Sequence, residues 1–418
     1  MSPRMVMANG GPDSAPGPEY SYVDLGDSGR LALVVTPQGR GAFSEQAQEV
    51  LSHLERVLEK QTQPMQITVQ TVFLREPGDR AECERVLAAF HGSKQPVTNF
   101  VLQPPCGGAA LALEAWAIAG KSVRVEHYGP QTLAVTYDSV RWVYCAGVEP
   151  GGTSRGVYAQ TMDALARMRA GLVQAGSRLE HVVRTWFYLG GITEPETGAQ
   201  RYQELNRART DCYHDVRFRC SLLDLNAPRG VYPASTGIGM AGKGLVLSCL
   251  ALETRRDDVF LLPLENPQQT PAYAYHPKYS PQSPKFSRAV ALVLGDYVTT
   301  WISGTASIVN AETRHVGNAE RQTEQTIENI ERLIAPENFV LHGVNGAGAG
   351  LRDLAKVRVY LKRAEDLAKC RAICERRLGS VPSIYAVADI CRPDLLVEIE
   401  GVAFARYARR VADREGVG

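Results

Sequence analysis

The 418-residue sequence has no long apolar run and almost no net charge, with 46 lysines and arginines against 45 aspartates and glutamates. Without an apolar run of about 18 residues, we expect no transmembrane helix. Without a basic block, the chain offers nucleic acid no electrostatic attraction. The first residues lack the apolar centre of a signal peptide, and their glycine, proline and serine content predicts a disordered tail over 1–28.

Metal-binding and nucleotide-binding motifs are also missing. Cys370 and Cys374 lie four residues apart in a helical stretch, but no further Cys or His follows at zinc spacing. There is no P-loop and no GxGxxG after a strand. We therefore expect no metal and no organic cofactor. The nine cysteines are scattered through apolar segments, which favours reduced thiols and a cytoplasmic protein.

What the sequence does contain is an internal repeat. Three blocks end in similar apolar strands, LALEAWAIA (111–119), LVLSCLALE (245–253) and VEIEGVAFA (397–405). A proline-containing turn precedes each ending, in KQPVTNF, VYPASTG and SVPSIYA. Further upstream, each block shows a long amphipathic helix, a strand and a second helix, in that order along the chain.

This order predicts an α+β protein with three mixed sheets, each carrying helices on one face. The turn-forming, proline-rich segment NPQQTPAYAYHPKYSPQSP separates the second block from the third. We assign 1–28 to the tail, 29–128 to a degenerate first repeat, 129–262 to the second, 263–289 to a linker and 290–408 to a catalytic third repeat.

The repeat allows one copy to act as a control for another. When the strand endings are set in register, Glu400 falls opposite Glu114 and Ser248, so a polar residue there serves the shared scaffold. Glu398 falls opposite alanine and valine, and an acid occurs at that position in the third copy only. A carboxyl held beside apolar walls has a raised pKa, which suits a general acid.

The second block is rich in arginine and tyrosine, most densely in RARTDCYHDVRFR. Guanidinium groups bind carboxylates in a planar fork, so this cluster predicts an anion-binding wall. Its candidates are Arg155, Arg209, Arg217 and Arg229, with Tyr158, Tyr202, Tyr213 and Tyr232; Ser235 and Thr236 would add hydroxyl donors.

The order of elements, with "VRVYL" and "VEIEGVA", resembles the Rid (YjgF-like) fold, which is related in shape to the trimeric chorismate mutase fold. Three linked copies resemble a Rid trimer joined into one chain, which implies a single-chain pseudo-trimer that is a monomer. More narrowly, "YPASTGIG", "SGTASIV" and "CRPDLLVEIEGVA" resemble the chorismatases. Those enzymes cleave chorismate to pyruvate and a cyclic acid, so the resemblance implies a small-molecule substrate.

The same resemblance implies roles for individual residues. Glu398 would protonate the terminal methylene carbon of the enolpyruvyl ether. Chorismatases that release 3-hydroxybenzoate have a glycine in the "SGTAS" motif and a cysteine seven residues before the catalytic glutamate. Gly304 and Cys391 match both, so the implied product is 3-hydroxybenzoate. Ala306, in the same motif, is expected to contact substrate.

Three alternatives remain open at this point. The enzyme could release a dihydroxycyclohexadiene carboxylate instead. It could be a Rid-like enamine or imine deaminase, although those enzymes place an arginine just after the proline of the turn, where this chain has Ala234 and Ser383. It could also be a non-catalytic ligand-binding repeat protein, which would not explain why Glu398 and Cys391 break the symmetry of the copies.

Overall fold

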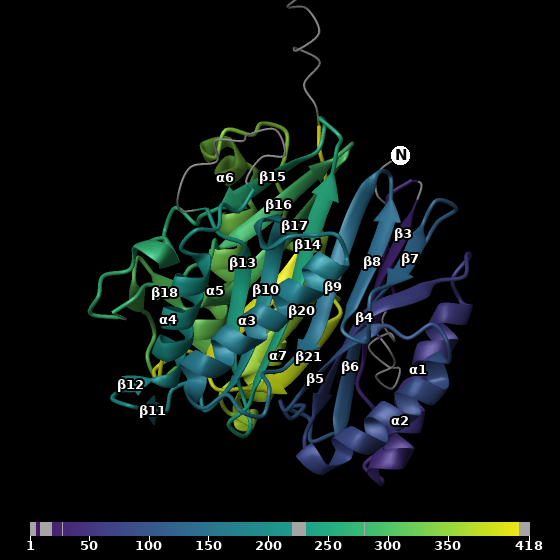
Figure 1. Cartoon of the computed structure of the whole chain (residues 1–418), viewed down its shortest axis with the longest axis horizontal. Helices are drawn as coiled ribbons and strands as arrows, with labels where there is room; N and C mark the ends of the chain where they lie inside the picture. Colours follow the sequence, from purple (N-terminus) through teal and green to yellow (C-terminus); the bar gives the residue numbers. More distant parts are fainter. Residues whose placement is uncertain (1–5, 9–18, 27, 220–230, 280, 409–418) are drawn as a thin grey trace, which may run out of the picture.

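The chain is described by a computed structural model that covers residues 6–8, 19–26, 28–219, 231–279 and 281–408. Within these ranges it forms three six-stranded sheets and two small two-stranded ones, in the expected mixed α+β class. Figure 1 shows the strands running side by side through the molecule, with helices against them. None of the helices in these ranges is both long and apolar enough to cross a membrane.

The first sheet has the strand order β1-β2-β3-β6-β4-β5. Its elements are β1 (Val6–Ala8), β2 (Glu19–Asp24), β3 (Gly29–Val35), α1 (Phe43–Glu59), β4 (Gln66–Leu74), α2 (Arg80–His91), β5 (Val97–Val101) and β6 (Leu111–Ala119). Helix α1 buries Val50, Leu54 and Val57, which the helical repeat places on one face, and that face packs on the sheet.

The second sheet has the order β13-β10-β14-β9-β8-β7. Its elements are β7 (Arg124–His127), β8 (Thr132–Tyr137), β9 (Val140–Val148), α3 (Gly156–Gln174), β10 (Val182–Gly190), α4 (Arg201–Tyr213), β13 (Ala234–Met240) and β14 (Leu245–Thr254). The hairpin of β11 (Pro195–Glu196) and β12 (Ala199–Gln200) leads into α4.

The third sheet has the order β15-β16-β17-β22-β20-β21. Its elements are β15 (Phe260–Leu264), β16 (Ala289–Leu294), β17 (Tyr297–Ala306), α5 (Ala319–Ile334), α6 (Pro336–Leu341), β20 (Leu354–Leu361), α7 (Leu367–Leu378), β21 (Ser383–Val387) and β22 (Val397–Arg406). The small hairpin of β18 (Ile308–Val309) and β19 (Glu312–Thr313) follows β17.

The three sheets share one topology, down to their irregularities. A proline precedes β5, β13 and β21, and each of these short strands runs parallel to β4, β10 or β20 respectively. The sequence indicated only a turn at these prolines. A β-bulge also interrupts β4, β10 and β20 near the start of each strand. Since bulges are specific features of a strand, their recurrence supports the repeat read from the sequence.

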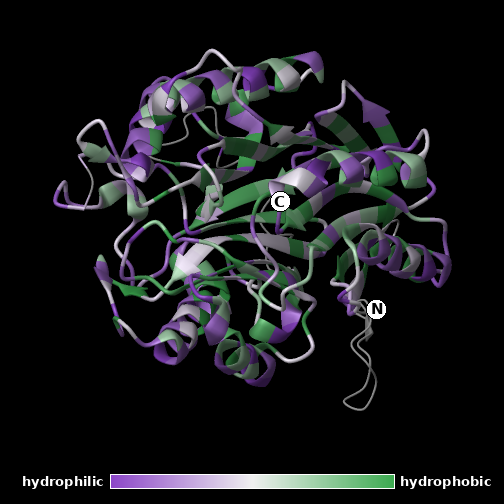
Figure 2. Cartoon of the chain, turned by 90° about the horizontal axis from the view of Figure 1, so that it is seen from below, coloured by the Kyte–Doolittle hydropathy of each residue, from purple (hydrophilic) through white to green (hydrophobic). Residues whose placement is uncertain are grey.

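Each sheet turns one face to its own helices and the other towards the middle of the molecule, as Figure 2 shows. In β22, Val397 and Ile399 pack in one apolar cluster with α5. The alternate residues Val402 and Phe404 pack in another cluster, with residues of β6 and β9 from the other two sheets. Alternation along one strand therefore separates a helix-covered face from an interior shared by all three sheets.

Two strands come before the expected repeat boundaries in the sequence but belong to the sheet that follows each boundary. β7 precedes residue 129 but pairs with β8 of the second sheet. β15 begins before residue 263 but pairs with β16 of the third sheet. Backbone hydrogen bonds, which the sequence pattern did not reveal, place both strands with the sheet that follows.

Candidate active site

Strand β22 points Glu398 and Glu400 to the face that looks into the molecule. Glu398 lies opposite Ala306 of β17 and Tyr360 of β20, while Glu400 lies opposite Arg358 of β20. Both glutamates are 4% exposed. The face that carries these two acids is therefore an interior surface between sheets and not a solvated one.

Glu398 lines a cavity of about 490 Å³ between the second and third sheets. The floor is formed where β13 meets β17, because the Ser235 amide donates to Ser303 Oγ (2.8 Å) and the Gly304 amide donates to Thr236 Oγ1 (3.0 Å). The lining residues are Gln200, Tyr202, Gln203, Asn206, Ser235, Gly237, Tyr275, Lys278, Tyr279, Pro284, Phe286, Arg288, Gly304, Ala306, Ile308, Glu312, Thr313, Cys391, Arg392, Pro393, Asp394, Leu395 and Glu398.

The carboxyl of Glu398 is set up to hold a proton. Burial raises its pKa, the charge of Glu400 raises it further, and Arg184 and Arg288 oppose the change, which leaves the pKa at about 8. At neutral pH this group is mostly protonated. A buried carboxylic acid facing a cavity can donate its proton to a bound molecule.

Gly304 provides the space that this carboxyl occupies. A Cβ at residue 304 would lie 2.1 Å from Glu398 Oε1 and 3.2 Å from Thr236 Cγ2. Gly304 sits in a bulge of β17, since the pairing with β22 shifts between Ile302 and Thr305. The glycine therefore makes room for the carboxyl of Glu398.

Four further predicted residues line the same cavity: Cys391, Tyr202, Ser235 and Ala306. Burial raises the pKa of the Cys391 thiol to about 12, with a contribution from Glu398, so the thiol stays neutral. Burial also raises the pKa of Tyr202, which remains a neutral phenol. Neither side chain is therefore ionised at neutral pH, and a thiol that keeps its proton is a poor nucleophile.

Two buried guanidinium groups flank the cavity. Arg288 lines it and donates to Tyr275 Oη (2.5 Å), and Arg209 lies behind the wall, where it donates to Ser235 Oγ (3.3 Å) and Asn206 Oδ1 (2.6 Å). Within the described ranges, neither arginine forms a salt bridge and the Nε of each has no hydrogen-bond partner. The Glu265 carboxyl lies near Arg288 and accepts a hydrogen bond from its backbone amide, but neither guanidinium group is in ion-pair contact with a described acid, which favours an anionic ligand.

The remaining predicted residues lie elsewhere. Thr236 is oriented towards Glu400 and Arg184. Tyr213, the last residue of α4, is buried against the rings of Phe218 and Tyr232. Arg155 is exposed just before α3, and Tyr158 donates to Asp211 outside the cavity (2.9 Å), because the start of α3 faces outwards. Arg229 lies outside the described residues.

Sequence reasoning missed the wall that the segment between β15 and β16 builds. Tyr275, Tyr279 and Arg288 come from this segment, which was predicted to be a linker, and Arg392 stacks over the Tyr279 ring at 4.7 Å. A signal was present, because YAYHPKY is rich in aromatic residues for a linker. Its contacts with β17 and α4 are not visible in the sequence.

Glu400, by contrast, is held as a carboxylate. Burial works against its ionisation, but Arg358 and Arg184 outweigh that cost and lower its pKa. Its oxygens accept hydrogen bonds from Arg184, Arg358, Trp186, Thr236 and Tyr360. Two glutamates on one strand face therefore have opposite protonation states.

Comparison with known proteins identifies relatives of this chain. A family model described as chorismatase FkbO/Hyg5-like, N-terminal, matches residues 114–251. A 3-hydroxybenzoate synthase from Streptomyces hygroscopicus is 33% identical over 298 residues, covering 69% of this chain and 80% of that protein. A chorismatase from Streptomyces rapamycinicus is 36% identical over 225 residues, covering 53% of this chain and 63% of that protein.

The fold comparison extends over more of the chain. A solved chorismatase structure has a TM-score of 0.63 and 23% sequence identity, and the match covers 90% of this chain and 98% of that one. The three six-stranded sheets thus occur in an arrangement that has been observed by crystallography. From the sequence relationship with the 3-hydroxybenzoate synthase, the chain belongs to the chorismatase family.

Proposed function

We propose that this protein cleaves the enolpyruvyl ether of chorismate to pyruvate and 3-hydroxybenzoate, with Glu398 as the general acid. One observation carries the proposal. A carboxyl with a pKa raised to about 8 shares a cavity of about 490 Å³ with the buried guanidinium group of Arg288, which forms no salt bridge with any described residue. That combination suits a small dicarboxylate that must be protonated at carbon.

The first step transfers the proton of Glu398 to the terminal methylene carbon of the enolpyruvyl group. The electron pair of the double bond forms the new C–H bond, and the ether-bearing carbon becomes an oxocarbenium ion. General acid catalysis of this kind contributes about two to four orders of magnitude.

The second step decides the product. The neighbouring ring hydroxyl attacks the ring carbon that carries the ether, and the broken C–O bond leaves its electron pair on the oxygen of pyruvate. The hydroxyl proton returns to the Glu398 carboxylate. The strained oxide then opens, loses a ring proton and becomes 3-hydroxybenzoate, so chorismate is divided into its two products with no other reactant.

The neutral Cys391 thiol and Tyr202 phenol support this route, because they line the cavity beside Glu398 without carrying charge. Aligning an internal nucleophile while excluding water can lower a barrier by several kcal/mol. If water attacked the oxocarbenium carbon first, the product would be a dihydroxycyclohexadiene carboxylate.

We propose that Arg288 binds one substrate carboxylate directly, and that Arg209 holds Ser235 in place as a hydroxyl contact for the other. Arg288 reaches the cavity directly, and Arg209 is linked to it through Ser235. Arg392, stacked on Tyr279, supplies a third positive charge on the same wall.

The decisive experiment incubates the purified full chain with chorismate, without added metal or cofactor, and identifies the products by chromatography. We expect equimolar pyruvate and 3-hydroxybenzoate. The diene acid alone would contradict the proposed second step. Release of ammonia from an imine substrate, with chorismate untouched, would indicate a Rid-like deaminase instead.

We further propose that the three sheets are Rid-like repeats forming a single-chain pseudo-trimer. The first division lies just before β7 and the second just before β15, so the segment over 263–289 that was predicted to be a linker falls within the third repeat. The shared strand order and bulges support this arrangement. Because each sheet already faces the other two, we propose a monomer. The eight described cysteines are free, which suits a cytoplasmic enzyme.

A further inference from the structure

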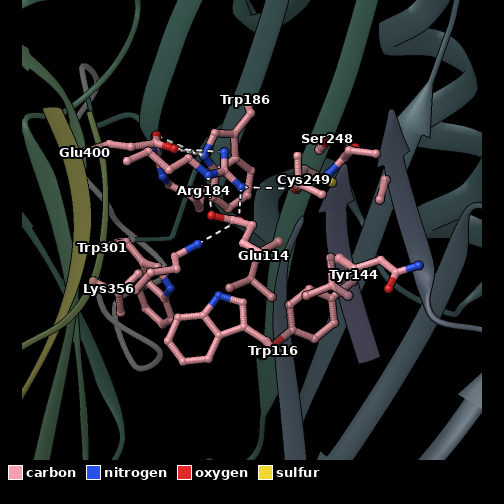
Figure 3. Close-up of a pocket in the computed structure, with 18 of the residues that line it drawn as sticks. Glu114, Trp116, Tyr144, Arg184, Trp186, Ser248, Cys249, Trp301, Lys356 and Glu400 are labelled. Carbon is pink, nitrogen blue, oxygen red and sulfur yellow. Dashed lines mark hydrogen bonds and ion pairs between the residues drawn. The ribbon is translucent and has the colours of Figure 1, made fainter. Parts of the chain in front are cut away.

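A second, smaller cavity of about 70 Å³ lies where the three sheets meet, and none of its lining residues lines the active-site cavity. The equivalent positions of the three closing strands, Glu114 of β6, Ser248 of β14 and Glu400 of β22, all line it. Figure 3 shows the side chains of these three residues converging on this space, with Lys356 and Arg184 between them.

The charges around this cavity do not balance. Its lining includes four cationic side chains, Arg30, Arg184, Lys356 and Arg358, but two carboxylates, Glu114 and Glu400. All six side chains are at most 7% exposed. At neutral pH two positive charges are therefore in excess in a region that water barely reaches. Burial lowers the pKa of Lys356 to about 8, because buried charge of this kind is costly unless it is compensated.

The two carboxylates are already fully used. Lys356 Nζ lies 2.7 Å from Glu114 Oε1, and Arg358 bridges Glu114 and Glu400, with a distance of 2.9 Å to Glu400 Oε1. Arg184 pairs with the other oxygen of Glu400. The fourth cation, Arg30, stacks on the Trp142 ring at 4.1 Å and has no ion-pair partner within the described residues.

Two features show where the missing negative charge belongs. The Nε of Arg30 is buried and has no hydrogen-bond partner among the described residues. Ser248 occupies the position at which the other two sheets carry glutamate, so the third carboxylate of a symmetric set is replaced by a hydroxyl that donates to Asn99. The cavity thus has an unpaired donor and lacks one of three equivalent anions.

We propose that this central cavity binds one small inorganic anion, of the size of chloride or bromide, in place of the carboxylate that Ser248 does not provide. The volume decides the class of ligand. An engineered cavity that holds benzene measures about 150 Å³, so a space of about 70 Å³ excludes an aromatic acid and admits a monoatomic anion with a water molecule.

This inference does not rest on the proposed function, because the anion would compensate buried charge between sheets. Its main effect should be on stability. An anion that binds only the folded chain raises the melting temperature in proportion to the logarithm of its concentration above the dissociation constant.

The test measures the melting temperature of the full chain against increasing chloride, with gluconate, which is too large to enter, maintaining constant ionic strength. We expect the melting temperature to rise with chloride and with bromide, and to rise linearly with the logarithm of the anion concentration once that concentration exceeds the dissociation constant. Lys356→Met removes half of the excess positive charge and should weaken chloride binding roughly tenfold, so that a roughly tenfold higher chloride concentration is needed for the same rise in melting temperature. The control Lys243→Met alters an exposed lysine and should leave the response unchanged.

A second variant supplies the missing charge directly. Ser248→Glu should melt at a temperature that no longer depends on chloride, because its carboxylate replaces the anion. Crystals soaked in bromide should show anomalous density between Arg30 and Lys356 in the wild type. Equal melting in chloride and gluconate, or no bromide density in this cavity, would overturn the proposal.

Discussion

Glu398 and Glu400 differ in charge state although they lie two residues apart on one face of β22. The difference in charge state comes from the groups that surround each carboxyl. Glu398 is opposite Ala306 and beside Gly304, whereas Glu400 accepts hydrogen bonds from two arginines. A carboxyl in apolar surroundings keeps its proton, and one that faces guanidinium groups loses it.

Glu398→Gln should reduce pyruvate release by roughly two to four orders of magnitude, since glutamine keeps the shape of the side chain but cannot give up a proton. Pyruvate release, measured by a coupled assay, checks this. Glu400→Gln should retain far more activity, because Glu400 serves the scaffold. Equal losses from the two variants would contradict the assignment.

The pH dependence follows from the pKa of Glu398, which is raised to about 8. The acid is active while protonated, so kcat/KM should be level below this pH and fall about tenfold per unit above it. The folded state holds the proton more tightly than the unfolded one, so its contribution to stability is complete below about pH 4.5 and is lost as pH rises through about 8. Glu400→Gln removes a charge that raises this pKa, so its activity should decline at a lower pH.

Gly304→Ala should reduce the rate of chorismate cleavage, because the added methyl group would displace the Glu398 carboxyl. Cys391→Ala leaves that carboxyl in place and should mainly shift the product towards the diene acid. Product chromatography and initial rates separate the two effects. A Gly304→Ala enzyme with full activity would show that the carboxyl can move without cost.

At the scale of elements, the segment between β15 and β16 contributes as much of the active-site wall as a helix does. It brings Tyr275, Tyr279 and Arg288 over β17 and closes the cavity beside α4. Proline and turn residues favour an irregular path, and irregular segments on a rigid scaffold often carry binding groups.

Arg288→Met should raise KM for chorismate, since a charge-assisted hydrogen bond to a carboxylate contributes about 1.5–3 kcal/mol. Arg155→Met is the matched control, because Arg155 is exposed outside the cavity and should leave KM unchanged. Steady-state kinetics of the two variants would measure both KM values. If only the Arg155 variant had a raised KM, the result would contradict this cavity as the substrate site and would support the arginine cluster predicted from sequence.

For the whole molecule, the junction of the three sheets is ionic and not only apolar. Glu114 of the first sheet is bound by Lys356 and Arg358 of the third, and Arg358 also reaches Glu400. Burial opposes ionisation of Glu114, but these two cations outweigh it and lower its pKa to about 2. The first sheet is thereby tied to the third sheet.

Glu114→Gln should destabilise the fold by about 3–5 kcal/mol, because it leaves buried cations without their partner. Urea unfolding would measure the loss. Glu328→Gln, on the exposed face of α5, breaks a surface pair with Arg332 and should cost about 0.5 kcal/mol or less. Similar midpoints for both variants would show that the junction is not held by charge.

The sequence by itself determined the elements and their repetition. The apolar periodicity of α1, α3 and α5, the three strand endings and the odd acid at Glu398 are local patterns, and backbone hydrogen bonding turns local patterns into helices and strands. The comparison of copies also singled out Glu398 from Glu400 before any contact was known.

Only the tertiary structure decided what surrounds those elements. Arg155 and Tyr158 belong to an arginine- and tyrosine-rich block but face outwards, while Arg288 has no motif around it yet reaches the cavity. The pKa of Glu398 depends on Arg184 of another sheet and on Arg288, far away in the sequence. Electrostatic surroundings sum over neighbours that long-range packing brings together, so no local pattern contains them.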